Sequence, residues 1–226
     1  YPGTQADISL YDHSLVTAAC TQALYLYHSE VKVWPMEYPE TAPQLPKFLL
    51  ISGDLSGMNR YLFHFATTNL TDVATILRAR SFYIQQITDI ASLHLLEALH
   101  LLPVARIMNA GGRFLLIAPN TPAIRETFAQ VQTTVETWLY ENFFGDLTLS
   151  LTTVEATAVD LMRQLPTTLD KLNDALDECQ LQRFATVGPN HHWQMPEAQW
   201  QHLQQHGICT ISGHFPAQTA DNSDKM

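Results

Sequence analysis

The stretch Gly111-Gly112-Arg113-Phe114 decides the fold, because it lies between two apolar runs, Val104–Met108 and Phe114–Ala118. Adjacent glycines tolerate positive φ angles and therefore form tight turns. Two strand-like runs joined by such a turn predict a β-hairpin, and the bare glycine backbone lets a ligand lie close to it.

The residues that follow the two glycines carry no acid. In the palm domains of nucleotidyl cyclases and polymerases, a hairpin of this kind bears carboxylates, because two metal ions must bridge the phosphates during in-line attack. Arg113 and Phe114 occupy those positions here. The hairpin therefore predicts a catalytically silent palm that needs a partner.

The elements around the hairpin follow the order β-α-β-β-α-β, with an extra helix in the first crossover. The apolar run Phe48–Ile51 predicts a strand buried on both faces, whereas the alternating run Leu147–Thr152 predicts a half-buried strand nearer a sheet edge. Periodicity and capping residues predict helices over residues 10–29, 56–66, 80–100, 169–184 and 197–205, and another from Pro122 onward. This order predicts an α+β fold: a ferredoxin-like βαββαβ palm, an antiparallel sheet with helices packed on one face, plus flanking helices.

Two of these helices have a recognisable core stripe. On the helix over 80–100 we expect Phe82, Ile87, Ile90, Ala91, Leu95, Ala98 and Leu99 to face the core. On the helix that Thr121 caps, we expect the same of Phe128, Val131, Val135, Trp138 and Leu139.

The composition is that of a globular protein, with 226 residues of which 46% are apolar. The formal net charge of −10 argues against a freestanding nucleic-acid-binding protein, which would carry a basic stripe. Three widely spaced cysteines favour a reducing compartment over a disulfide framework, so we expect a cytoplasmic protein. No run approaches the roughly 18 apolar residues of a membrane span, so we expect no membrane partner.

The segment Ile51–Gly57 places two glycines and an acid at the end of the first predicted strand. Backbone amides at a helix N-terminus can cradle a phosphate, and Asp54 could hold a metal ion. The alternative is that the glycines form the turn while Asp54 or Ser56 caps the helix.

Arg78 and Arg80 precede the aromatic pair Phe82-Tyr83 at a predicted helix start. These arginines either contact phosphate or RNA, or face solvent and pair with acids. His13, beside Asp12 at the head of the first helix, would suit a metal ligand, although an Asp-His pair also serves as a cap followed by a surface histidine.

A second group of metal-binding residue types lies near the C-terminal end of the sequence. His202 and His206 are four residues apart and are followed by Cys209 and His214, a spacing that can bind zinc. The chain has no Cys-x-x-Cys pair, however, and this argues against a zinc site.

Four stretches, taken in order, resemble one known family: Asp7–His13 with Thr17–Ala19, Leu49–Met58, Arg78–Tyr83 and Gly111–Phe114. The family is the large signature subunit of type III CRISPR effector complexes, Csm type, and the resemblance covers about residues 7–155. Members of the family are longer. They carry a permuted HD nuclease domain, a first palm, a zinc-bearing linker, a second palm with a Gly-Gly-Asp-Asp hairpin, and a helical C-terminal domain.

The resemblance implies a domain order for this chain. Residues 1–33 resemble the C-terminal end of the HD domain, 34–46 a Pro-rich linker, 47–160 the first palm, and 161–226 a helical or irregular linker segment with a disordered tail. His13 stands where the HD domain places its displaced first histidine, but the His-Asp pair with which it would work is absent. Cys209–Gly213 is similar to the Cys-x-x-Cys-Gly of the zinc linker, with Ser212 where a thiolate is expected, which argues against zinc binding.

The resemblance also implies a function. In the family, target RNA switches on DNA cleavage by the HD domain and synthesis of cyclic oligoadenylates from ATP held between the palms. For this chain it implies a noncatalytic first palm that forms one wall of the ATP cleft, inactive alone, with these positions facing the nucleotide: Ser52, Gly53, Asp54, Gly111 and Gly112.

The partners implied by the resemblance are a second palm, which would supply the divalent metal, and other type III effector subunits. Guide and target RNA would act indirectly. The alternative is a structural module that holds neighbouring subunits together and binds no nucleotide.

Overall fold

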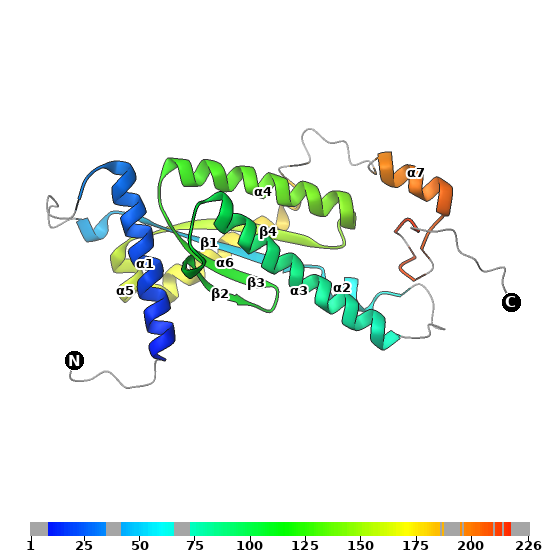
Figure 1. The fold of residues 1–226 in the computed structure, drawn as a ribbon, viewed down its shortest axis with the longest axis horizontal. Helices are drawn as coiled ribbons and strands as arrows, with labels where there is room; N and C mark the ends of the chain where they lie inside the picture. Colours follow the sequence, from blue (N-terminus) through cyan, green and yellow to red (C-terminus); the bar gives the residue numbers. More distant parts are fainter. Residues whose placement is uncertain are drawn as a thin grey trace.

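A four-stranded antiparallel sheet forms the centre of the protein, with strand order β2-β3-β1-β4 (Figure 1). The structure is a computed structural model that describes residues 9–34, 42–65, 73–185, 187, 195, 197–209, 211–213 and 215–217. The strands are β1 (Phe48–Ser56), β2 (Arg106–Ala110), β3 (Arg113–Pro119) and β4 (Thr148–Ala156). β1 and β3 lie in the middle and β4 lies at an edge, which confirms the predicted arrangement.

The helices agree with the sequence in order and differ in their bounds. They are α1 (Leu10–Val31), α2 (Met58–Phe63), α3 (Val73–Ala98), α4 (Pro122–Phe143), α5 (Ala158–Arg163), α6 (Leu165–Leu181) and α7 (Glu197–His206), with short 3₁₀ turns η2 (Ala42–Gln44) and η3 (Pro103–Ala105). Thr121 caps α4 through the N–H of Ile124, as predicted. α5 was not predicted, and α3 begins at Val73 rather than at residue 80.

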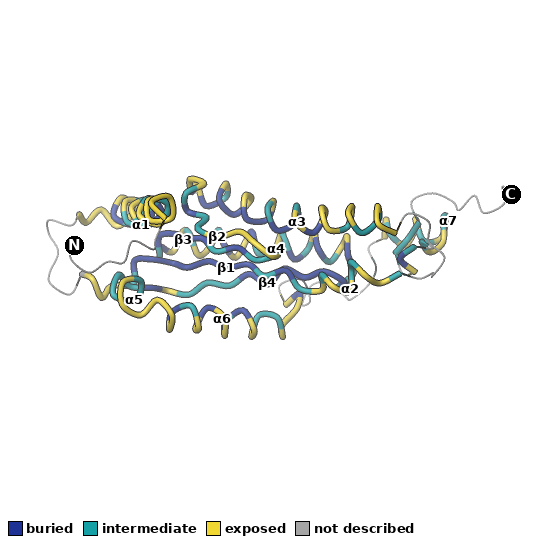
Figure 2. Tube along the Cα trace, turned by 90° about the horizontal axis from the view of Figure 1, so that it is seen from below, coloured by how far each residue is buried: buried dark blue, intermediate teal, exposed yellow. Residues whose placement is uncertain are grey.

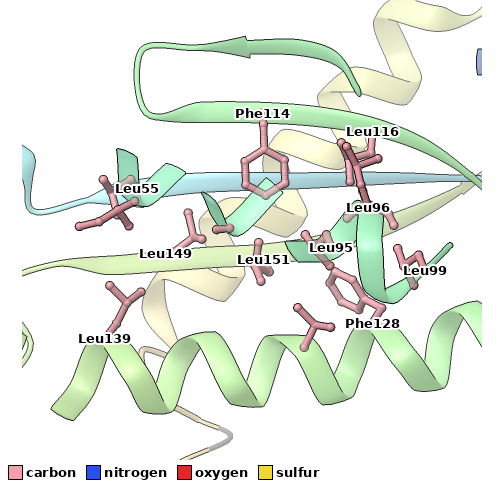
Figure 3. Close-up of a cluster of buried hydrophobic side chains, with 14 of the residues drawn as sticks. Leu55, Leu95, Leu96, Leu99, Phe114, Leu116, Phe128, Leu139, Leu149 and Leu151 are labelled. Atoms are coloured by element: carbon pink, nitrogen blue, oxygen red, sulfur yellow. The ribbon is translucent and has the colours of Figure 1, made fainter. Parts of the chain in front are cut away.

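The two crossover helices, α3 and α4, cover one face of the sheet, as the ferredoxin-like fold requires. Figure 3 shows Leu95, Leu96 and Leu99 of α3 and Phe128 and Leu139 of α4 gathered against the strand side chains Phe114, Leu116, Leu149 and Leu151. Ile90 and Phe82, which were predicted to join this core, are 60% and 64% exposed instead. Ile90 borders a groove between α3 and α4 instead, and Trp138 of α4, which was also predicted to face the core, is 42% exposed at the same groove.

The flanking helices α1 and α6 cover the other face, which the sequence did not predict. Ala19 and Ala23 of α1 and Leu172 of α6 pack against Phe48, Leu50 and Ile117. Figure 2 shows α3 and α6 on opposite sides of β1 and β4. Because α6 lies against β4, the residues Thr148, Leu149, Ser150 and Leu151 are all buried, so the prediction of a half-buried strand was wrong.

The outer edge of β4 receives side chains from both helical layers. The backbone oxygen of Leu151 accepts a hydrogen bond from Gln132 Nε2 of α4 at 3.3 Å and one from Cys179 Sγ of α6 at 3.6 Å. Burial raises the pKa of the Cys179 thiol, so the thiol stays protonated at neutral pH and can donate.

Several predictions fall on residues outside the described part of the chain. These are most of the Pro-rich linker (35–41), the start of the HD-like segment (1–8), and the tail predicted to be disordered (218–226). Among the described residues, no helix has both the length and the hydropathy needed to cross a bilayer.

Candidate functional site

The hairpin between β2 and β3 turns through Gly111 and Gly112, whose φ angles are 65° and 85°. Only residues without a Cβ adopt such angles at little cost, so the glycine pair fixes this turn. The turn is tied to the neighbouring strand, because the N–H of Leu55 donates to the oxygen of Gly112 at 2.9 Å. A Cβ added at Gly111 would meet nothing within 4 Å, so this backbone is accessible.

A cleft of about 440 Å³ lies between this hairpin and α3. Gly111 and Gly112 line it, together with a polar stripe on α3 and Asn109 of β2. The stripe consists of Ser81, Gln85, Thr88 and Asp89: Gln85 follows Ser81 by four residues, and Thr88 and Asp89 follow Gln85 by three and four, which places them along one side of α3. The stripe was not among the predicted site residues, although its helical spacing is visible in the sequence.

Asp89 joins the cleft to the sheet through a small polar network. Its Oδ1 accepts hydrogen bonds from Arg106 Nη1 at 2.5 Å and from Asn109 Nδ2 at 2.9 Å. Arg106 Nη1 also donates to Ser92 Oγ at 2.7 Å. These bonds hold Asp89 and Asn109 in place at one end of the cleft, where polar groups can orient a ligand.

Ser52 and Gly53 do not face this cleft, although the sequence placed them at the nucleotide. The predicted strand ended at Ile51, but β1 continues to Ser56, so both residues lie inside the sheet. Ser52 is 1% exposed, and its hydroxyl donates to the oxygen of Phe114 at 3.0 Å. Gly53 lies beneath the Phe114 ring, because a Cβ added there would be 2.4 Å from ring carbons.

Asp54 and Arg113 lie opposite each other in neighbouring strands, and both side chains reach α6. Asp54 Oδ2 accepts a hydrogen bond from Gln180 Nε2 at 2.8 Å, and Arg113 Nη2 donates to Asn173 Oδ1. An acid on β1 and an acid after the glycines would have to converge to hold two metal ions. Arg113 supplies a cation instead, so the described residues do not fit a two-metal centre.

The sequence suggested that backbone amides at the start of the helix after Ile51–Gly57 could cradle a phosphate, but the geometry of this segment does not favour that role. α2 begins after Gly57, whose φ is 89°, and neither Asp54 nor Ser56 caps it. The helix has six residues and its N-terminal side is closed by the backbone, since a Cβ at Gly57 would lie 1.9 Å from the oxygen of Asp146.

Arg78 and Arg80 lie within α3 rather than before it. Arg80 Nη1 donates to the backbone oxygens of Tyr61, Leu62 and His64 at 2.8, 3.3 and 3.0 Å, so it closes the C-terminal end of α2. Arg78 is exposed, and its Nε donates to the oxygen of Ala74 one turn earlier. Arg80 is partly buried, and no ion pair between Arg80 and an acid occurs in the described part of the chain; contact of either arginine with phosphate or RNA stays a prediction.

The candidate metal ligands that the structure describes form no cluster. His13 is exposed on the first turn of α1, and no cluster of three His, Cys, Asp or Glu side chains occurs among the described residues. Ser212 is buried, and its Oγ accepts the N–H of Phe215 at 3.2 Å, so a hydroxyl holds the turn where a second thiolate would stand. Burial alone would raise the pKa of Cys209, but hydrogen bonds from the N–H groups of Ser212 and Ile211 lower it below its ordinary value. His214 lies outside the described residues.

We expect the purified chain to hold no stoichiometric zinc. One thiolate is too few for the tetrahedral sites that zinc forms with cysteine and histidine. Elemental analysis after gel filtration should therefore give far less than one zinc per chain. About one zinc per chain would instead mean that His206 or His214 has replaced the missing thiolate, and substitution of each histidine would then identify the ligand.

The sequence model of one family, described as "Csm1 subunit domain B", matches residues 47–196, which contain the whole sheet, the hairpin and the cleft. The chain belongs to this family. The resemblance inferred from the Gly-Gly hairpin and the motifs around it is thereby confirmed. The Csm1 domain B match extends past β4 to include α5 and α6, the elements that cover the second face of the sheet.

Curated relatives share this part of the sequence. The subtype III-A CRISPR single-strand-specific deoxyribonuclease Cas10/Csm1 of Mycobacterium tuberculosis is 31% identical over 163 residues, covering 70% of this chain and 20% of the relative. The protein of the same description from Thermococcus onnurineus is 32% identical over 144 residues, covering 64% and 18%. The chain thus spans about a fifth of the length of these relatives.

Solved Csm1–Csm4 cassettes contain a similar domain. The apo cassette has a TM-score of 0.70 and 28% identity over 81% of this chain and 24% of the matched chain. The cassette in complex with AMPPNP has a TM-score of 0.69 and 28% identity over 80% and 24%. The cassette in complex with cA4 has a TM-score of 0.69 and 27% identity over 81% and 24%.

Proposed function

We propose that this chain is the noncatalytic first palm of a type III CRISPR large subunit and forms one wall of a cleft that holds ATP for cyclic oligoadenylate synthesis. Residues 47–160 would be the palm, 1–33 the end of an HD domain, 34–46 a linker, and 161–226 a further linker segment. The observation that carries the proposal is the cleft beside Gly111 and Gly112, which has polar lining but no pair of acids.

The geometry supports a role in binding rather than in chemistry. Phosphoryl transfer needs metal ions that neutralise the attacking and leaving oxygens. The side chains of Asp54 and Arg113 are bonded to α6, away from the hairpin cleft. A second palm would therefore supply the metal and the catalytic acids, and this palm would supply backbone and polar contacts from Gln85, Asp89 and Asn109.

The proposed partners follow from the solved relatives, which are Csm1–Csm4 cassettes, one of them described as a subcomplex of the type III-A interference complex. We propose that other effector subunits bind this chain and that guide and target RNA influence it through them, in the cytoplasm. His13 would take part in an HD nuclease only with residues from a longer protein.

A purely structural module is the second candidate function. An apolar groove of about 300 Å³ between α3 and α4 favours it, because Tyr83, Ile90 and Trp138 expose their side chains there. Apolar grooves of this kind are typical of contact surfaces. In that case the chain would join neighbouring subunits and bind no nucleotide.

Reconstitution with a second palm tests the proposal. The chain alone should make no cyclic oligoadenylate from ATP and Mg²⁺, with or without RNA, whereas the two-palm complex should make it. Products are measured by liquid chromatography and mass spectrometry. A photoreactive ATP analogue should label the hairpin or residues 81–89 of this chain in the complex. Labelling confined to the second palm would favour the structural module, and synthesis by the chain alone would contradict the noncatalytic role.

A further inference from the structure

A second cavity, of about 510 Å³, is lined by residues of α2, α3, α4 and α7 and by Phe215–Ala217. Figure 1 shows α7 beyond the same end of the sheet as α2. The cavity shares no lining residue with the cleft at the hairpin. Its walls come from three parts of the chain: α2 with α3, the C-terminal end of α4 with Phe144, and Gln199 and His202 of α7 together with Phe215–Ala217. Its volume is in the range of sites that bind small molecules, roughly 300–1,000 Å³.

Arg80 supplies a fixed positive charge to this cavity. Three backbone oxygens hold its Nη1, and its guanidinium lies 5.4 Å from the ring centroid of Tyr61 and 4.7 Å from that of Phe65. These contacts are with carbonyl groups and rings, and none of the ion pairs among the described residues includes Arg80. Within the described residues, the guanidinium is thus held in place by groups that do not neutralise its charge, and its remaining N–H groups can bind an anion.

Aromatic rings form much of the remaining wall. Phe143 packs against Tyr61 and Tyr83 at centroid distances of 5.7 and 5.9 Å, and Phe144 packs against Phe215 at 5.7 Å. Such rings offer flat apolar surfaces on which a planar group can stack. Polar groups lie among them: Asn142 donates through Nδ2 to the oxygen of Trp138, which leaves its Oδ1 as an acceptor, and His202 is exposed at the α7 side.

We propose that this cavity binds a nucleoside phosphate, with the base against the aromatic wall and the phosphate at Arg80. A nucleotide combines a planar aromatic group, hydrogen-bonding edges and an anion, and each has a counterpart in the lining. Stacking on aromatic side chains together with a basic group is a general way to bind nucleotides without sequence preference. The ligand is either a free mononucleotide or the phosphorylated terminal nucleotide of an RNA strand. The site is separate from the ATP cleft and does not depend on it.

Titration calorimetry with adenosine 5′-monophosphate tests the proposal, with adenosine as the probe that lacks the phosphate. Arg80→Gln should weaken binding of the monophosphate at least tenfold, because glutamine can still reach a carbonyl but carries no charge. Arg78→Gln is the matched control. It removes one positive charge two residues away on the same helix, outside the cavity, and should change the affinity less than twofold. Equal affinity for adenosine and its monophosphate would overturn the proposal.

Two further variants keep the test decisive. If circular dichroism shows that Arg80→Gln disturbs the fold, His202→Ala, on the exposed side of α7, should weaken binding several-fold. A monophosphate that binds the hairpin cleft instead would lose affinity in Gln85→Trp, which fills that cleft, and keep it in Arg80→Gln, and this outcome would overturn the proposal. A 5′-phosphorylated trinucleotide that binds more tightly than the monophosphate would identify a strand end as the ligand, whereas tighter binding of the monophosphate would identify a free nucleotide.

Discussion

Replacement of Gly53 by valine is expected to lower the free energy of unfolding by about 3 kcal/mol, a typical upper value for overpacking a core. A Cβ at this position would lie 2.4 Å from two ring carbons of Phe114 and 2.9 Å from Leu151 Cδ2. Phe114 is fully buried, so its ring has no solvent-filled space into which it can move. The loss would be a large part of the about 5–15 kcal/mol by which domains are stable.

Urea unfolding followed by circular dichroism measures this loss. Gly111→Ala is the matched control, because its Cβ meets nothing within 4 Å and only the positive φ of 65° is strained. That strain should cost about 1–2 kcal/mol. If Gly53→Val lost no more unfolding free energy than Gly111→Ala, Gly53 would have room for a side chain. Such room is expected of a position that faces a ligand and contradicts the packing against Phe114.

Gln85→Trp is expected to reduce cyclic oligoadenylate synthesis by the two-palm complex at least tenfold, which corresponds to about 1.4 kcal/mol of lost binding or positioning. Gln85 is exposed and lines the hairpin cleft, so an indole there would fill space proposed for ATP without disturbing the core. Gly112 and Ser52, the positions that sequence alone would select for this test, are less suitable. A Cβ at Gly112 meets Met58 Sδ at 2.8 Å, and Ser52 lies inside the sheet.

Leu93→Trp provides the control, since Leu93 is 44% exposed on the same helix and does not line the cleft. It should leave synthesis unchanged, and both variants should retain binding of target RNA in the assembled complex. Product formation is measured by mass spectrometry and RNA binding by gel shift. Unchanged synthesis by Gln85→Trp would show that the hairpin cleft does not bind ATP, and it would favour the structural module as the function of this chain.

The hairpin, the strand order and α4 were predictable because local signals specify them. Two glycines fix the turn, and Thr121 and Pro122 fix the helix start. The positions of Ser52 and Gly53 inside β1 could not be predicted, because the apolar run stops at Ile51. Only the folded chain brings the ring of Phe114 against Gly53 and shows why a small residue is needed there. Similarly, Ile90 fits the helical period of the core yet lies exposed beside the apolar groove, since packing, not periodicity, decides which side of α3 meets the sheet.

The candidate site was predictable only in part. Gly111 and Gly112 line the cleft, as the turn suggested, whereas the sequence could not show that Asp54 would bond to Gln180 on the opposite face. Neighbouring side chains of a strand lie on opposite faces of the sheet. Because the predicted strand ended at Ile51, this alternation was not applied to Asp54, which β1 in fact includes. The polar stripe of α3 was visible as a period in the sequence, but only the fold shows that it lies across from the hairpin.

The hydrogen bonds to the Leu151 oxygen affect whether the β4 edge can pair with a strand of another copy of the chain. A sheet edge with free N–H and C=O groups can recruit a strand from another molecule, and natural sheets block such edges. Gln132 from one layer and Cys179 from the other both occupy the Leu151 carbonyl in the middle of β4. An incoming strand would have to displace both side chains to pair there, so this edge resists the strand exchange that leads to aggregation.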